Sequence, residues 1–211
     1  MANKIPAQPI NWHDFETLMH RVSQAAIEPG NEKLYRFLIF CGLVAYGGLP
    51  PRFVLAMQWD FLSVPRLFSE PEEVAPYLRF PRTSPLTINA QGGVDCWEVN
   101  ISEELLDIIE ISYKLSLKMF SDNKSTFRYR KIITSVKSKG KNSMRAQSLN
   151  ILLKDVANEF GGSDNISALT LYKTYFRHQF ELQGQSIDAL KKISAYLKHG
   201  SLDITRKFIC I

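Results

Sequence analysis

Near the C-terminus, three side chains that can bind a phosphate stand at fixed separations from an aromatic residue. Arg177 and His178 are adjacent, His199 lies 22 residues after Arg177, and Phe208 lies nine residues after His199. A guanidinium donates paired hydrogen bonds to phosphate oxygens, and a protonated imidazole also donates. These residue types therefore predict phosphate binding.

The strongest charge feature of the chain lies in segment 118–145. It holds nine basic residues against one acid, Asp122, a local charge of +8 in a chain whose net charge is +5. A basic run is often only a solvated loop, and this interpretation stays open. The interleaved aromatic residues Phe127 and Tyr129, and a following helix that we expect Ser143 to cap, favour phosphate contact. The candidate phosphate-contacting residues are Arg128, Arg130, Lys131, Lys137, Lys139, Lys141 and Arg145, together with Arg177 and His199.

The composition predicts one globular domain over residues 1–211, with residues 1–10 as a loose lead-in. Of the 211 residues, 45% are hydrophobic, which is enough for a sizeable core. Three scattered cysteines, Cys41, Cys96 and Cys210, suit neither a disulfide framework nor a metal site, so we expect no metal and no cofactor. The sequence has no signal peptide and no apolar stretch long enough to cross a bilayer. We therefore expect a soluble, cytoplasmic protein without a membrane partner.

Apolar residues at helical spacing predict that the fold is mainly α. The first expected helices follow Asn11, span about 34–45 up to Gly47-Gly48, and follow Pro50. Later helices are expected after the capping residues Ser102 and Ser143, from about Ser167 to Leu182, from Ser186 and over 204–209. Between about Val74 and Val99, prolines and glycines separate short alternating segments, which predict a small three-stranded antiparallel sheet. The expected fold class is thus α+β, mainly helical with one small sheet.

In their order and spacing these residues resemble the catalytic domain of tyrosine recombinases, the phage integrase family. That family carries a His-x-x-Arg-His helix, a later Leu-Gly-His turn, and a nucleophilic tyrosine nine residues after that histidine. Segment 174–178 matches the helix, 197–201 matches the turn, and Phe208 takes the place of the tyrosine. Upstream, 48–60 resembles the family's Thr-Gly-Leu-Arg segment, and 140–161 resembles the stretch before the His-x-x-Arg helix. The resemblance implies the recombinase catalytic fold and contact with double-stranded DNA.

The departures from the family pattern fall on the residues that would break the phosphodiester bond. Besides Phe208, Pro50 replaces the first arginine and Thr174 replaces the first histidine. The family's hairpin lysine has no clear counterpart, although we expect Arg79 or Arg82 to lie in the corresponding strands. An engineered replacement of tyrosine would explain Phe208 but not the other two positions, so we favour natural loss of the catalytic set. Groups that act as a unit fail together, and we expect no strand cleavage.

The surviving residues Arg177, His178 and His199 have two interpretations. A helical arginine or histidine is usually a surface group or a satisfied core group. The matched spacing instead favours a retained phosphate-binding surface. Typical family members also close a clamp around DNA with a separate N-terminal core-binding domain, which we expect to be missing here, so binding should need a partner.

The sequence therefore predicts a catalytically inactive, recombinase-like protein that binds double-stranded DNA. We expect it to act as an accessory or regulatory factor of a mobile genetic element, together with an active recombinase or another protein of that element. Two alternatives stay open. One is a divergent recombinase that uses another nucleophile, such as Tyr196. The other is a protein interaction module that regulates a recombinase without binding DNA.

Overall fold

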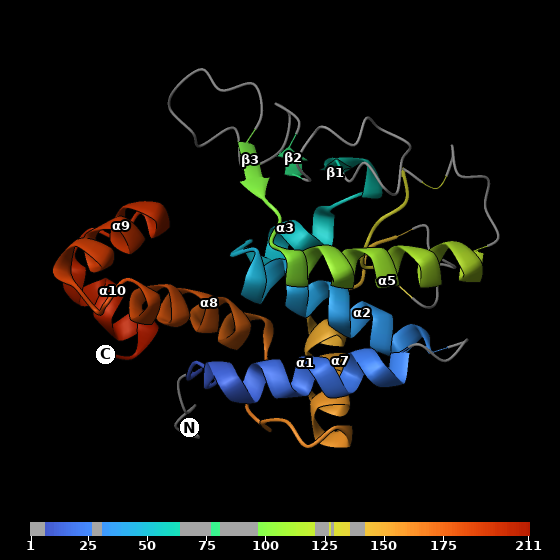
Figure 1. The fold of residues 1–211 in the computed structure, drawn as a ribbon, viewed down its shortest axis with the longest axis horizontal. Coiled ribbons are helices and arrows are strands. Elements are labelled where there is room, and N and C mark those ends of the chain that lie inside the picture. The colour runs from blue at the N-terminus through green and yellow to red at the C-terminus, as the bar shows by residue number, and fades with distance from the viewer. Residues whose placement is uncertain are drawn as a thin grey trace.

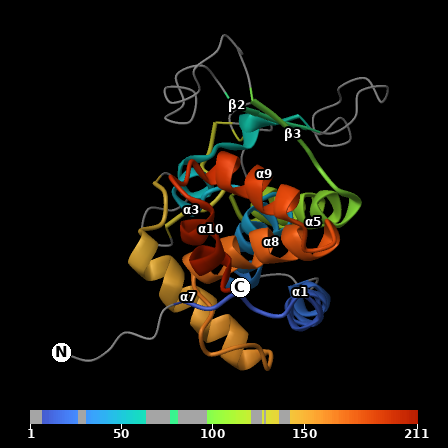
Figure 2. The same cartoon turned by 90° about the vertical axis from the view of Figure 1, so that its left-hand side faces the viewer.

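The computed structural model describes residues 7–26, 31–63, 77–80, 97–120, 127, 129–135 and 142–211. Most of these residues are helical. A small sheet lies at the top of the view in Figure 1, and helices α8, α9 and α10 gather at one end of the molecule, which Figure 2 shows face on. That end carries the residues that the sequence singled out as a site.

The N-terminal helices begin at the predicted signals. Helix α1 spans Trp12–Ala26 behind Asn11, whose Oδ1 accepts a hydrogen bond of 2.9 Å from the backbone N–H of His13. Helix α2 (Glu32–Cys41) continues into a π-helical turn, η1 (Gly42–Tyr46), and α3 (Pro51–Ala56) follows with a proline at its first position. A 3₁₀ turn, η2 (Trp59–Phe61), ends this helical block.

The three described strands pair antiparallel in the order β1-β2-β3. Strand β1 (Leu62–Ser63) pairs with β2 (Tyr77–Phe80), which pairs with β3 (Trp97–Asn100). Strand β1 precedes the range 74–99 in which the sequence placed the sheet. Most of that range, residues 81–96, lies outside the described residues and includes Arg82 and Cys96.

The later helices are α5 (Glu103–Phe120), α7 (Ala146–Glu159), α8 (Ala168–Leu182), α9 (Ile187–Leu197) and α10 (Leu202–Ile209). Helices α8 and α9 begin at the predicted positions, where Ser167 and Ser186 cap them, each accepting a backbone N–H at 3.1 Å. The prediction that Ser143 caps α7 is wrong. Ser143 instead forms a bridge with Thr134, and the residue before α7 is Arg145, which makes no side-chain cap.

Two hydrophobic clusters hold the described chain together. The larger one includes α2, which is buried on all sides from Leu34 to Cys41. The smaller one joins α8, α9 and α10 through Phe176, Phe180, Ala189, Leu190, Ile193 and Ile209. Because burying one large apolar side chain contributes about 2 kcal/mol, the smaller cluster fixes α8 against α10. It thereby sets the relative positions of Arg177, His199 and Phe208.

Candidate functional site

The α9–α10 turn brings His199 and Phe208 together. Lys198 takes a left-handed conformation (φ 54°, ψ 40°) at the end of α9, and this reverses the chain into the turn. Ser201 then caps α10 by accepting the N–H of Ile204 at 3.4 Å. As a result, the His199 and Phe208 rings meet edge to face, with centroids 5.4 Å apart. The spacing of nine residues therefore corresponds to a contact.

The half-buried ring of Phe208 lies among aromatic rings and one cation. Its ring meets Tyr172 and Phe176 edge to face, at centroid distances of 6.1 and 6.3 Å. The ammonium of Lys173 lies 5.3 Å from the ring centre, within range of a cation–π interaction. Phe208 thus acts as a packing residue of the smaller cluster. It brings no oxygen to the site.

His199 is a neutral group at pH 7. Its Nδ1 lies 2.9 Å from the hydroxyl of Thr205, which itself donates to the carbonyl of Ser201 at 3.4 Å. Because that hydroxyl proton is already used, we assign the ring proton to Nδ1, which leaves Nε2 as an acceptor. Partial burial lowers the pKa of His199 below its usual 6.5. His199 can therefore donate to a phosphate only after it gains a second proton.

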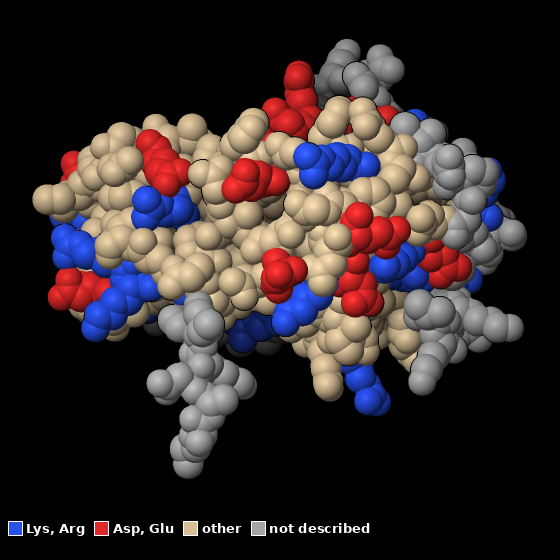
Figure 3. Space-filling view, turned by 90° about the horizontal axis from the view of Figure 1, so that it is seen from below, with Lys and Arg blue, Asp and Glu red and all other residues tan. Residues whose placement is uncertain are grey.

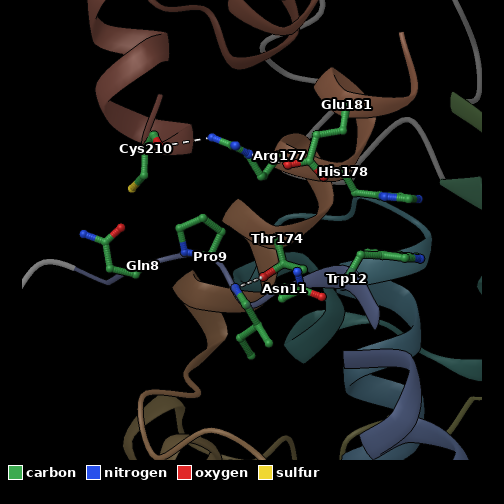
Figure 4. Close-up of a pocket in the computed structure, with 10 residues that line it drawn as sticks. Gln8, Pro9, Asn11, Trp12, Thr174, Arg177, His178, Glu181 and Cys210 are labelled. Carbon is green, nitrogen blue, oxygen red and sulfur yellow. Dashed lines mark hydrogen bonds and ion pairs between the residues drawn. The ribbon is translucent and has the colours of Figure 1, made fainter. Parts of the chain in front are cut away.

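Arg177 joins α8 to the end of α10. Its Nε donates to Glu181 at 2.6 Å, and its Nη1 donates to the backbone carbonyl of Cys210 at 3.1 Å, as Figure 4 shows. That carbonyl lies at the helix end, where carbonyls have no partner within the helix. Among the described residues no group pairs with Nη2, and 30% of the side chain is exposed. Two of the three guanidinium nitrogens are thus used within the molecule.

The other two α8 positions face the N-terminal segment. The His178 ring stacks on Trp12, with centroids 3.7 Å apart and planes 2° from parallel (Figure 4). Burial lowers the pKa of His178, although the carboxylates of Glu16 and Glu181 oppose this. Thr174 is 1% exposed; its hydroxyl donates to the carbonyl of Thr170 and accepts the N–H of Ile10, both at 2.9 Å. Neither side chain pairs with His199 in the described part of the chain.

The loop before α3 lies against α8 and α9. Gly48 has a φ of +66°, and a Cβ added there would lie 2.4 Å from Cε1 of Tyr175. The hydroxyl of Tyr196 donates to the carbonyl of Gly48 at 3.4 Å. Pro50, two residues after Gly48, is the residue before α3, and it offers neither a charge nor a backbone donor. The exposed Arg52 lies near enough to Tyr172 for its charge to lower that residue's pKa, although burial has the larger effect and raises it.

A pocket of about 300 Å³ opens between α8, the end of α10 and the segment before α1. Figure 4 shows Gln8, Pro9 and Trp12 along one side, and Arg177 and Cys210 along the other.

Among the described residues no group of acidic, histidine or cysteine side chains could hold a metal ion. No helix in the described part of the chain is long and apolar enough to cross a membrane.

Two side chains of segment 118–145, those of Phe127 and Lys131, contact the rest of the fold. Phe127 is fully buried and stacks on Trp59 with centroids 5.8 Å apart, so its ring belongs to the core and is not exposed beside the basic residues. Tyr129 is 68% exposed. The ammonium of Lys131 donates to the carbonyl of Ala56 at 2.7 Å, at the end of α3.

The structure describes only some of the other basic residues in segment 118–145. The backbone carbonyl of Arg130 accepts the N–H of Trp59 at 3.2 Å. Arg145 is exposed immediately before α7. Lys124, Arg128, Lys137, Lys139 and Lys141 lie outside the described residues.

Sequence reasoning missed Lys173. It is 8% exposed, and its ammonium donates to the carbonyl of Ala7 at 2.8 Å while it faces the ring of Phe208. The one signal in the sequence is a lysine within the largely apolar run from Leu171 to Phe176, where a cation would be buried by its neighbours. Its partner lies 166 residues away in sequence, and no local pattern predicts such a contact.

Comparison with known proteins supports the fold. No protein-family model matches the sequence, and no curated protein matches it either. Solved structures that match include XerA recombinase, with a TM-score of 0.61 and 13% identity over 99% of this chain. They also include the XerH site-specific recombinase bound to its palindromic difH substrate after cleavage, with a TM-score of 0.61 and 11% identity over 98% of this chain. This chain covers 60% of the XerA chain and 50% of the XerH chain, so it has a recombinase-like fold that matches part of each.

Proposed function

We propose that this protein binds double-stranded DNA through a recombinase-like fold and does not cleave it. In this proposal it is an accessory or regulatory factor of a mobile genetic element, and it works with an active recombinase or another protein of that element. The observation that carries the proposal is the environment of Phe208. A ring without a hydroxyl packs against His199, where the resembling family places its nucleophile.

The groups around Phe208 also support a loss of catalysis. In the family that this chain resembles, charged side chains donate hydrogen bonds to the phosphate. Here Pro50 and Thr174 occupy the positions of two of those side chains. The hydroxyl of Thr174 is used by two backbone groups, and His199 is neutral with an acceptor at Nε2. A phosphate at this point would meet few preorganised donors, and these usually supply the largest part of the stabilisation of a transition state.

Segment 118–145 supports the DNA-binding part of the proposal. Figure 3 shows one face of the molecule on which basic and acidic side chains are interspersed over the described surface, without a continuous basic patch. The excess positive charge of the chain is concentrated in segment 118–145, with a net +8. Arg145 offers an exposed guanidinium at the start of α7. Contacts of this kind give affinity without reading sequence.

We further propose that Arg177 and His199 add little to that affinity. Arg177 has one guanidinium nitrogen without a partner in the described chain, so it can supply at most one further phosphate contact. His199 contributes only when it is protonated. Most of the affinity then comes from Arg128, Arg130, Lys131, Lys137, Lys139, Lys141 and Arg145.

The environment of Tyr196 disfavours the alternative of another nucleophile. Burial raises the pKa of Tyr196 to about 12, and its hydroxyl donates to the carbonyl of Gly48. A nucleophilic hydroxyl needs a base or a lowered pKa, and the environment of Tyr196 does the opposite.

A salt titration tests the DNA-binding proposal. The apparent affinity for a DNA duplex should fall linearly with the logarithm of salt concentration, and Arg145→Gln should reduce the slope by about 0.9. Lys154→Gln, the same charge change about 14 Å further along α7, is the matched control and should alter the slope less. Absence of binding at low salt, or affinity that does not depend on salt, contradicts the proposal.

The interaction-module alternative has one observation in its favour. Leu182 and Ile187, on either side of the turn between α8 and α9, are 66% and 62% exposed. If the protein co-purifies with an active recombinase but binds no duplex at low salt, this alternative replaces the DNA-binding proposal. If Leu182→Lys leaves that co-purification unchanged, this turn is not the contact surface.

A further inference from the structure

The segment that precedes α1 crosses the face of α8 that carries Lys173, Thr174 and His178. We name residues 7–11 the strap. Its backbone accepts a hydrogen bond from the Lys173 ammonium at Ala7 and donates one to Thr174 from Ile10. Directly after the strap, Trp12 stacks on His178. The strap and Trp12 therefore occupy three neighbouring positions of α8, one of them a buried cation.

Lys173 is a buried charge without a matching carboxylate. It is 8% exposed, and no acidic side chain pairs with its ammonium within the described part of the chain. An ammonium has three donors, and among the described residues its partners are one carbonyl and the face of the Phe208 ring. Buried charges in proteins are normally paired, because desolvation is costly. A phosphate would compensate this charge better than the present partners do.

The strap is held by few contacts. Two hydrogen bonds join it to α8, and each such bond favours the closed state by about two- to tenfold. Ile10 packs on the core, whereas Gln8 and Asn11 are exposed. The pocket of about 300 Å³ lies between the strap, α8 and the end of α10, as Figure 4 shows, so the strap is not packed tightly along its length. An open state within reach of thermal fluctuation follows from these contacts.

We propose that the strap is an autoinhibitory element that withholds Lys173 from DNA phosphate. When the strap leaves α8, the Lys173 ammonium loses the carbonyl of Ala7 and is exposed beside Phe208 and His199. It then takes a phosphate oxygen as its partner. The proposal rests on the DNA-binding function proposed above, and it adds both a binding residue and a device that controls its access.

Substitution at Ile10 tests the strap in the full-length chain. Proline at this position has no N–H and breaks the bond to Thr174, whereas Ile10→Ala keeps the N–H and is the matched control. We expect Ile10→Pro to raise the affinity for a DNA duplex by about two- to tenfold at low salt. The slope of affinity against salt should steepen by up to about 0.9, the value of one phosphate contact. Thr174→Val removes the same bond from the α8 side and should act in the same direction.

Lys173→Gln identifies the cation that is released. In the wild-type background it should change affinity little, and in the Ile10→Pro background it should abolish the gain. The proposal is overturned if the increase in DNA affinity persists without Lys173. It is also overturned if neither Ile10→Pro nor Thr174→Val increases the affinity while thermal unfolding shows that both are folded.

Amine labelling separates the strap from the proposed function. In the free protein, Lys173 should react with an acetylating reagent more slowly than the exposed Lys192 of α9. Because Ile10→Ala loses only the packing of Ile10 on the core, whereas Ile10→Pro also loses the bond to Thr174, the labelling rate of Lys173 should rise at least twofold more in Ile10→Pro than in Ile10→Ala. If no variant binds DNA but this pattern holds, the DNA-binding proposal fails and the strap stands as a gate to Lys173. If Lys173 reacts equally in all three proteins, the strap proposal itself fails.

Discussion

Replacing Arg177 with glutamine separates its structural role from phosphate binding. The change removes the bond from Nη1 to the carbonyl of Cys210 and the ion pair with Glu181. A partly buried, charge-assisted hydrogen bond contributes about 1–2 kcal/mol to stability. The pair with Glu181 spans one helical turn and is 30% and 39% exposed, so it adds only about 0.3–0.5 kcal/mol. We therefore expect Arg177→Gln to lower the free energy of unfolding by about 1.5–2.5 kcal/mol.

Urea unfolding monitored by circular dichroism measures this loss. Glu181→Gln is the matched control, because it removes the ion pair but leaves the bond to Cys210, and it should cost about 0.5 kcal/mol or less. For a chain of this size the larger loss corresponds to a melting temperature lower by about 3–8 °C. The salt slope of DNA binding should fall by at most about 0.9, since one guanidinium nitrogen is unpaired in the described chain. This prediction is refuted if Arg177→Gln is no less stable than Glu181→Gln and binds DNA more than a hundredfold more weakly than wild type. Arg177 would then be a phosphate ligand and would not hold α8 to the end of α10.

Three further predictions follow from the same structure. The lowered pKa of His199 leaves it neutral at pH 7, so its contribution to DNA affinity should appear only as pH falls from 7.5 to 5.5. DNA affinity should therefore increase over this range, and in a binding titration the increase should be smaller for His199→Gln than for wild type. The same shift means that stability from neutral His199 is present above pH 6.5 and is lost as pH falls, so the urea midpoint of wild type should drop more than that of the variant. Gly48→Ala should cost about 2–4 kcal/mol in urea unfolding, because φ is +66° and the new Cβ meets Tyr175, and Tyr175→Leu should recover part of the loss. Glu32→Gln should lower the free energy of unfolding by about 1–2 kcal/mol in the same assay, because it weakens the 2.8 Å ion pair with Arg36, whose side chain is 2% exposed. An unchanged urea midpoint would contradict this.

The local parts of the fold could be predicted from the sequence because they depend on local chemistry. Asn11, Ser167 and Ser186 each provide a side-chain oxygen just before a helix, and each accepts a backbone N–H there. Ser143 has the same side chain but pairs with Thr134, a contact between separate segments that outweighs a capping preference. The capping rule thus fails where a longer-range pairing uses the residue.

The candidate site was predictable in its spacing but not in its contacts. The nine-residue separation of His199 and Phe208 corresponds to two rings that touch, because a short turn and a capped helix fix the distance. Arg177 and Lys173 each donate to a backbone carbonyl, and Ala7 lies 166 residues from Lys173. Backbone carbonyls carry no signature in the sequence. A cation that looks available for phosphate can therefore be committed within the fold.

The proposed combination of DNA binding without strand cleavage is tested most directly by one gel experiment. The protein is incubated at low salt with a nicked duplex that traps covalent intermediates, and each sample is divided between a native gel and a denaturing gel. The account predicts a shifted band in the native gel that disappears as salt rises, and no protein–DNA band in the denaturing gel. A band that survives denaturation, or the absence of any shift at low salt, would contradict it.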